Sequence, residues 1–387
     1  MTTLDPKIFT LSTPSISAMV ALLIILFDVL GNGGSQRRTK LKLALFFATT
    51  TVTTCSALIY FYYPNIFLWI NGLYMFSILS MPIFLYAFIF KITCTDKPEQ
   101  FSNLHYLAPT VLAIFLIIVS LFTPVEEQML TIKGNGAYNG GSRLFFYASN
   151  CKLFIRLIFS IVYILFIFKR LPKYRLYIVN YSSNESKSSL HWVPIYLLFM
   201  IGTIPIPLLG QFMPRDTLVS SGFAFIHVAI LIVQHSFLAY HAVKENYILP
   251  ERNNYCTKLP DLMFPEEDNA ITDFPLKKSA LTRDTFERYI RTEKPYLNPE
   301  LKITDLVDNL KINRSYISSF INTEYGMNFS NYINMCRLKE YENLRSCSKL
   351  IDISNTELVE MAGFGSYRSY LRMAKQEGKE RSKAEKK

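Results

Sequence analysis

Cysteine is scarce in this sequence and occurs in no recognisable arrangement. The six cysteines among 387 residues form no CxxC pair and show no Cys/His spacing typical of a zinc site. We therefore expect reduced thiols, no disulfide framework and no metal ion. Catalytic motifs are also missing: there is no phosphate-binding loop, nucleophile elbow, HExxH helix or kinase-like histidine box. We therefore expect no cofactor and no enzymatic activity.

Charged residues are also few, at 18% against 50% hydrophobic residues, a balance that is too apolar for an ordinary soluble protein. Up to about Val243 the hydrophobic residues gather in long runs, and a membrane-spanning helix needs about 20 of them. A cleaved signal peptide is the alternative for the first run, but no small-x-small cleavage site follows it. We predict a bundle of seven spanning helices, at 8–31, 41–63, 66–90, 104–123, 144–168, 192–212 and 218–240.

The positive charges between these runs predict the orientation of the bundle. Connections on one side carry ten Lys and Arg residues and those on the other side carry four. An excess of Lys and Arg marks the cytoplasmic side. We therefore expect a multi-pass protein of the cytoplasmic membrane, with its N-terminus outside and its C-terminal region inside. The ten are Arg37, Arg38, Lys40, Lys91, Lys97, Lys169, Arg170, Lys173, Arg175 and Lys187; the four are Lys7, Lys133, Arg143 and Arg215.

Two basic residues within the fifth run, Lys152 and Arg156, stand one helical turn apart on one face. A site for an anionic small-molecule signal is one interpretation, because charges within a membrane are expensive and face a cavity or a partner. The alternative is that both side chains reach the outer lipid headgroups. The sixth run is interrupted by Pro194, Pro205 and Pro207, so this helix either kinks or lines a cavity.

Two short helical patterns separated by a tight polar break stand in the C-terminal region. The first covers 304–310 and the second 315–324, with Asn313 placed to cap the second. Tyr316 and Ile317 are expected to face inward. A small helical hairpin of any kind is the alternative, but the outward face of the second helix is typical of a helix-turn-helix reading helix. That face carries Arg314, Ser315, Ser318, Ser319 and Asn322.

A second copy of this arrangement follows. A short helix is predicted at 354–362, then Gly363 at a position that needs a positive φ, then a helix capped by Ser366. A longer helix at 329–345 separates the two copies and would hold them at a fixed distance, so that they address successive major-groove faces. The exposed side of the last helix carries Tyr367, Arg368, Arg372 and Lys375.

A series of residues runs in order through these two copies: Pro295, Tyr296, Leu297, Asp305, Leu306, Arg314, Ser315, Tyr316, Ile317, Glu324, Tyr325, Gly326, Met327, Arg337, Leu338, Gly363 and Phe364. This ordered series resembles the DNA-binding domain of the AraC/XylS family over roughly 281–378. The resemblance implies a bihelical domain that controls transcription. It also implies that bases are read by Arg314, Ser315, Ser318 and Ser319 in the first copy and by Tyr367, Arg368 and Arg372 in the second. The sequence departs from the family pattern at Lys311, where a turn glycine is usual, and at Ala374, where a large aromatic is usual.

The sequence as a whole therefore predicts an all-α, membrane-anchored regulator of transcription. Its expected partners are double-stranded DNA, membrane lipid and a small-molecule signal; a homo-oligomer is left open, because one chain already carries two reading units. In one alternative the protein is a receptor or resembles a transporter, and its C-terminal helices bind a protein partner. In another the bundle only anchors the chain. The expected division is 1–243 for the bundle, 244–281 for a linker, 282–378 for the DNA-binding domain and 379–387 for a basic tail.

Overall fold

In the structure, a computed structural model, the regular secondary structure of the described residues is helical, apart from one antiparallel bridge between Ser182 and Lys302. By its internal contacts the chain divides into two units, Met1–Tyr174 with Leu190–Leu249, and Arg175–Ser189 with Pro250–Lys387. Most of the predicted linker and the end of the predicted tail lie outside the described residues. Those residues are 5–31, 33–95, 99–134, 137–184, 187, 189–210, 212–249, 281–347 and 353–384, without the side chains of 35 and 379–384.

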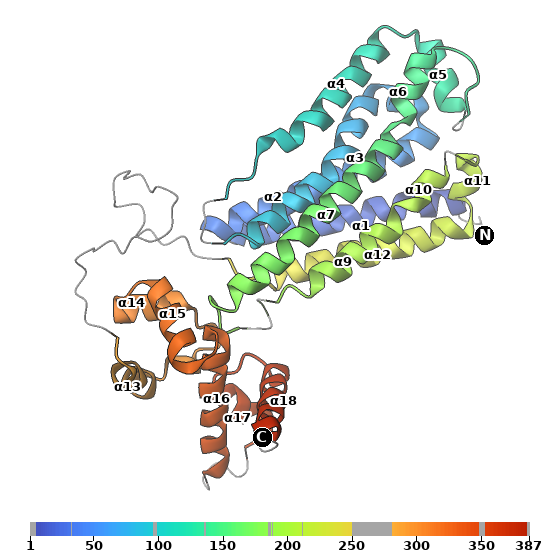
Figure 1. Cartoon of the computed structure of the whole chain (residues 1–387). Coiled ribbons are helices and arrows are strands. Elements are labelled where there is room, and N and C mark those ends of the chain that lie inside the picture. The colour runs from blue at the N-terminus through green and yellow to red at the C-terminus, as the bar shows by residue number, and fades with distance from the viewer. Residues whose placement is uncertain are drawn as a thin grey trace, which may run out of the picture. The chain divides into compact units, whose positions relative to one another are not determined.

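The first unit is a bundle, and the prediction of seven spanning helices is confirmed: seven helices are long and apolar enough to cross a membrane (Figure 1). Three of the predicted spans are each built from two consecutive helices. The helices are α1 (Pro6–Gly31), α2 (Gly34–Tyr62), α3 (Pro64–Ile92), η1 (Asn103–Tyr106) with α4 (Leu107–Leu121), α6 (Arg143–Asn150) with α7 (Lys152–Ile178), α9 (Trp192–Thr203) with α10 (Pro205–Leu209), and α12 (Gly222–Val243), while α5 (Val125–Lys133) and α11 (Arg215–Val219) are short connecting helices.

The bundle buries one set of apolar side chains and displays another. Helix α2 packs between α1 and α3, and α12 packs against α1 and α9. Large apolar side chains nevertheless cover the outside, with Trp69 90% and Phe27 73% exposed. Such a surface is not stable in water but suits hydrocarbon. The seven helices therefore indicate a membrane protein.

One buried charge within this bundle is neutralised by carboxylates. Lys40 is fully buried, and its Nζ lies 2.6 Å from an oxygen of Asp28 and 2.8 Å from an oxygen of Glu245. This pairing matters because an uncompensated buried charge costs several kcal/mol. Lys40 therefore shows how this bundle compensates a buried cation, and the other buried cations can be compared with it.

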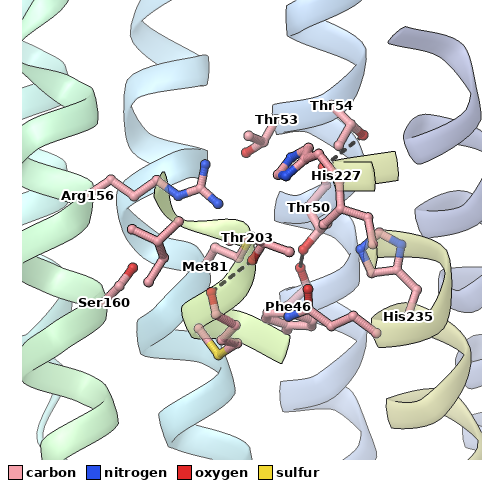
Figure 2. A pocket seen from close by; sticks show the side chains of 14 residues that line it. Phe46, Thr50, Thr53, Thr54, Met81, Arg156, Ser160, Thr203, His227 and His235 are labelled. Atoms are coloured by element: carbon pink, nitrogen blue, oxygen red, sulfur yellow. Dashed lines mark hydrogen bonds between the residues drawn. The ribbon is translucent and has the colours of Figure 1, made fainter. Parts of the chain in front are cut away.

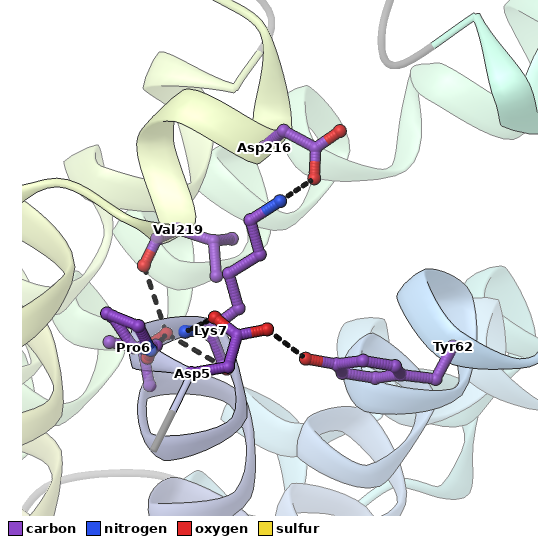
Figure 3. A network of polar contacts seen from close by, with 7 residues as sticks. Asp5, Pro6, Lys7, Tyr62, Asp216 and Val219 are labelled. Carbon is purple, nitrogen blue, oxygen red and sulfur yellow. Dashed lines mark hydrogen bonds and ion pairs between the residues drawn. The ribbon is translucent and has the colours of Figure 1, made fainter. Parts of the chain in front are cut away.

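The N-terminal end of α1 is fastened to its neighbours by a polar network (Figure 3). Lys7 Nζ lies 2.9 Å from an Asp216 carboxylate oxygen in α11, and the Tyr62 hydroxyl donates to Asp5 at 3.3 Å. Thr10 Oγ1 donates to the Val219 carbonyl at 3.0 Å. These bonds hold together the segments that surround a cavity at this end of the bundle.

The second unit contains six α-helices among its described residues, besides the end of α7. Helix α16 packs against α15, α17 and α18. Ile317 and Ile321 of α15 are fully buried, as is Val359 of α17. The inward placement predicted for Tyr316 is wrong: its side chain is 47% exposed, because the buried stripe of α15 follows Ile317 and Ile321. The helices are α13 (Arg283–Glu293), η3 (Pro295–Leu297), α14 (Ile303–Leu310), α15 (Arg314–Tyr325), α16 (Phe329–Ser346), α17 (Asn355–Met361) and α18 (Tyr367–Ala384).

Candidate functional site

A cavity of about 230 Å³ opens among helix ends in the first unit. Its wall includes the start of α1, the end of α2, the starts of α3 and α7, and the segment from α10 to α11. The prolines of the sixth span explain part of this shape. Helix α9 ends at Thr203, α10 begins at Pro205, and Pro207 and Gly210 line the cavity. Of the two alternatives for this span, both describe it: the helix is interrupted after Thr203, and its last part lines a cavity.

Lys152 is positioned at this cavity by the first turn of α7. Its side chain is buried, with the whole residue 8% exposed, and Nζ donates to Asn71 Oδ1 at 2.8 Å. The ammonium also lies 4.7 Å from the ring centre of Tyr74 and 5.4 Å from that of Phe67. The side chain is therefore directed into the bundle, and the alternative of reaching to the headgroups does not describe it.

Arg215 brings a second positive charge to the same cavity from the connection between the sixth and seventh spans. Its guanidinium donates to the Tyr60 hydroxyl at 2.8 Å and to Asn150 Oδ1 at 2.6 Å. In the sequence, Arg215 stands out only as a positive charge between two spans. A basic residue just after the Pro- and Gly-interrupted sixth span was the signal that could have identified it.

Arg156 lies one turn beyond Lys152 and faces a smaller cavity of about 70 Å³. Figure 2 shows its guanidinium pointing from α7 towards Thr53 and His227. The Arg156 Nε is buried and has no hydrogen-bond partner among the described residues. His227 and Thr54 line both cavities, so the two spaces adjoin.

No carboxylate within the described part of the chain forms an ion pair with Lys152, Arg156 or Arg215. Their partners among the described residues are neutral: two amides, a phenol and aromatic rings. Lys40, buried in the same bundle, has two carboxylates. The cavity therefore concentrates positive charge that the surrounding protein leaves uncompensated.

In the second unit, the helix pair α14–α15 has the local features that the sequence predicted. Asn313 caps α15, since its side chain accepts from the Ser315 amide at 2.9 Å. Lys311 ends α14 in a left-handed conformation with φ 56°, the conformation for which glycine is usual. Of the predicted reading residues, Ser315, Ser319 and Asn322 are exposed, and Ser318 is half-buried.

Arg314, the first residue of α15, is engaged by a segment that the sequence assigned to the bundle. Its guanidinium carbon lies 4.8 Å and 5.0 Å from the ring centres of Tyr177 and Tyr181. One Nη also lies 3.2 Å from the Tyr177 hydroxyl, and burial lowers the pKa of Arg314 to about 10. Both tyrosines belong to 175–189, the connection between the fifth and sixth spans, which is part of the second unit.

Arg337 on α16 fastens the same connection and was missed as a functional residue. It is 1% exposed, and its guanidinium donates to Ser183 Oγ at 2.9 Å and to the Tyr296 and Asn298 carbonyls at 2.7 Å each. Its signal in the sequence was a charge on the apolar stripe of α16, one turn from Ile333. The stripe is buried at Ile333 and Tyr341 on either side of it.

The helix pair α17–α18 repeats the arrangement of the first pair. Ser354 forms a capping box with Glu357 at the start of α17. Ser366 Oγ accepts from the Ser369 amide at 3.2 Å at the start of α18, and Ala374 packs against the core shared with α16. The four residues predicted on the DNA-binding face of α18, Tyr367, Arg368, Arg372 and Lys375, are all exposed.

No protein-family model, curated protein or solved structure matches this chain.

Proposed function

We propose that this chain is a membrane-anchored transcription regulator that reads double-stranded DNA with two helix-turn-helix units, α14–α15 and α17–α18. One observation carries the proposal: α15 and α18 each begin at a capped turn behind a shorter helix, and each turns polar or basic side chains outward. This is the layout of a reading helix that enters the major groove. Both helices pack on α16, which would fix their separation.

The resemblance to the AraC/XylS family supports the same function. Exposed Arg368 and Arg372 on α18 suit bidentate contacts with guanine. The serines and Asn322 on α15 suit shorter hydrogen bonds to base edges. The tyrosines of 175–189 hold Arg314, so its contact with DNA would require the release of that stacking.

The bundle supplies the anchor, and the distribution of Lys and Arg supports a cytoplasmic position for the second unit. In a prokaryotic cell this is the compartment that holds DNA. Helix α7 offers a covalent route for a signal, since its first two turns carry Lys152 and Arg156 and its last turn carries Tyr177. A displacement of α7 at the cavity would reach Arg314 through Tyr177.

Gel-shift measurements with the full chain in detergent, at several stated salt concentrations, test the proposal. DNA fragments would come from upstream of its own gene and the neighbouring genes. We expect Arg368→Ala to weaken binding about tenfold or more, because a contact to a base edge is lost. We expect a smaller loss for Arg314→Ala, because that guanidinium is held by tyrosines in the free chain.

Arg291→Ala is the matched control, since Arg291 is an exposed arginine on α13, which is not one of the proposed reading helices. Its affinity for DNA is expected to stay unchanged. An equal loss of affinity in Arg291→Ala would mean that DNA is bound only through general attraction between charges. If no fragment bound even at low salt, the receptor or transporter-like alternative with a protein partner would be favoured.

A further inference from the structure

We propose that the cavity of the bundle binds amphipathic anions, molecules with one acidic headgroup on an apolar body. The acidic group would lie against Lys152 and Arg215, and the body would lie along the apolar wall. This inference deepens the sensing part of the proposed function and rests on it only for its biological role. Binding itself is a property of the first unit and can be measured without DNA.

The charge balance of the bundle is the first argument. Lys40 shows how this chain compensates a buried cation, with two carboxylates within 2.8 Å. Lys152 and Arg215 line one cavity and have only neutral partners among the described residues. Two cations near each other in a medium of low dielectric repel strongly. An anion between them removes this repulsion and contributes attraction to both.

The lining of the cavity is the second argument, because it selects the rest of the ligand. Away from the two cations the wall is mainly aliphatic and aromatic, so a small inorganic anion would leave it unfilled. Burial of a hydrocarbon or aromatic body there contributes about 25 cal/mol for each Å² removed from water. The apolar part of the wall includes Leu11, Pro14, Phe61, Ile206, Leu218 and Val228.

Arg156 adds a third positive charge, at the smaller cavity. This space adjoins the main cavity across Thr54 and His227. Its other polar lining consists of hydroxyl groups such as those of Thr53 and Ser160 (Figure 2), the Gln234 amide and the His235 ring. Among the residues that the structure describes, no carboxylate lines either cavity. Both spaces therefore favour an anion over a neutral or cationic ligand of the same shape.

Binding can be tested with the full chain in nanodiscs of neutral phosphatidylcholine, using dodecanoate as the probe. Dodecanol and dodecyltrimethylammonium carry the same alkyl chain without charge and with a positive charge. Thermal unfolding of the bundle can be followed by tryptophan fluorescence, since Trp69 and Trp192 both belong to the first unit. We expect dodecanoate to raise the unfolding temperature with saturation, and the other two probes to leave it unchanged. An equal response to dodecanol would overturn the proposal.

Lys152→Met and Arg215→Met are the decisive variants, and each is expected to weaken dodecanoate binding about tenfold or more. Arg143→Met is the matched control, because Arg143 is an exposed cation on α6 that lines neither cavity. Without probe, Lys152→Met is expected to unfold at the same temperature as the natural chain or higher, since it removes an uncompensated charge. Natural affinity in both decisive variants, or a matching loss in Arg143→Met, would refute the site.

The anion can come from the bilayer or from solution, and mass spectrometry of the purified chain separates these sources. A fatty acid or anionic lipid that copurifies with the natural chain and not with Lys152→Met identifies the bilayer. Binding of water-soluble octanoate to a chain without any copurified anion identifies solution. Absence of DNA binding would leave all these results standing, so the two proposals fail separately.

Discussion

Replacing Arg337 with methionine is expected to destabilise the second unit by about 3–5 kcal/mol. The guanidinium is almost completely buried and joins α16 to Ser183 and to the carbonyls of Tyr296 and Asn298. Methionine fills much of the space but donates no hydrogen bond. Each buried carbonyl left without a donor costs about 1–3 kcal/mol.

Hydrogen exchange provides the measurement, because two backbone bonds report directly on this region. The Ile303 amide donates to the Tyr181 carbonyl and the Ser330 amide to the Val179 carbonyl, each at 2.9 Å. We expect exchange at both amides to become about 100-fold faster or more, as a loss of about 3 kcal/mol or more implies. Peptides from the bundle should exchange at their natural rate.

Lys339→Met is the control, since Lys339 is exposed on the same helix. It changes a basic residue to methionine without breaking a buried network, so exchange at Ile303 and Ser330 should not change. Unaltered protection in Arg337→Met would show that 175–189 is held to the second unit by its backbone bonds alone.

Replacing Gly363 with alanine is the second change with a large expected effect. Gly363 ends α17 with φ +88°, and the Gly363 and Phe364 amides donate to the Glu360 and Val359 carbonyls at 2.9 Å and 3.2 Å. This pair of bonds is a Schellman motif. An added Cβ would overlap the Tyr296 carbonyl oxygen and lie 2.6 Å from Leu297 Cα, and neither backbone atom can rotate away.

The expected cost is about 3–4 kcal/mol, the sum of overpacking and of a left-handed conformation for a residue with a Cβ. Gly326→Ala is the matched control: Gly326 also has a positive φ, of +65°, but its Cβ would meet nothing within 4 Å. It should cost only about 1–2 kcal/mol. Urea unfolding of the full chain, followed by exchange at α17 and α16 peptides, compares the two. Equal costs would mean that η3 moves aside.

These two variants act on one point of the molecule. The Tyr296 carbonyl accepts from Arg337 and is the atom that an alanine at 363 would strike. The double variant should therefore lose less stability than the sum of the single losses, because neighbouring sites are not additive. Helix η3, together with 175–189, is thus the place where the two helix pairs and the connection between spans meet.

The sequence alone determined the features that depend on neighbouring residues. The seven spans follow from long apolar runs, and Asn313 and Ser354 were recognisable as caps or helix starts because a cap acts within three residues. Gly363 was expected at positive φ from its place after a short helix, and φ +88° agrees. Lys152 and Arg156 were singled out because a charge within an apolar run is conspicuous.

Only the tertiary structure decided which distant residues meet. Lys152 and Arg215 share a cavity although 63 positions separate them, and Arg337 binds Ser183 across 154. Sequence reasoning assigned 175–189 to a loop of the bundle, whereas its contacts place it with the second unit. The physical reason is that helix formation is encoded by local periodicity, while buried polar contacts between helices depend on packing that leaves no repeating pattern in the sequence.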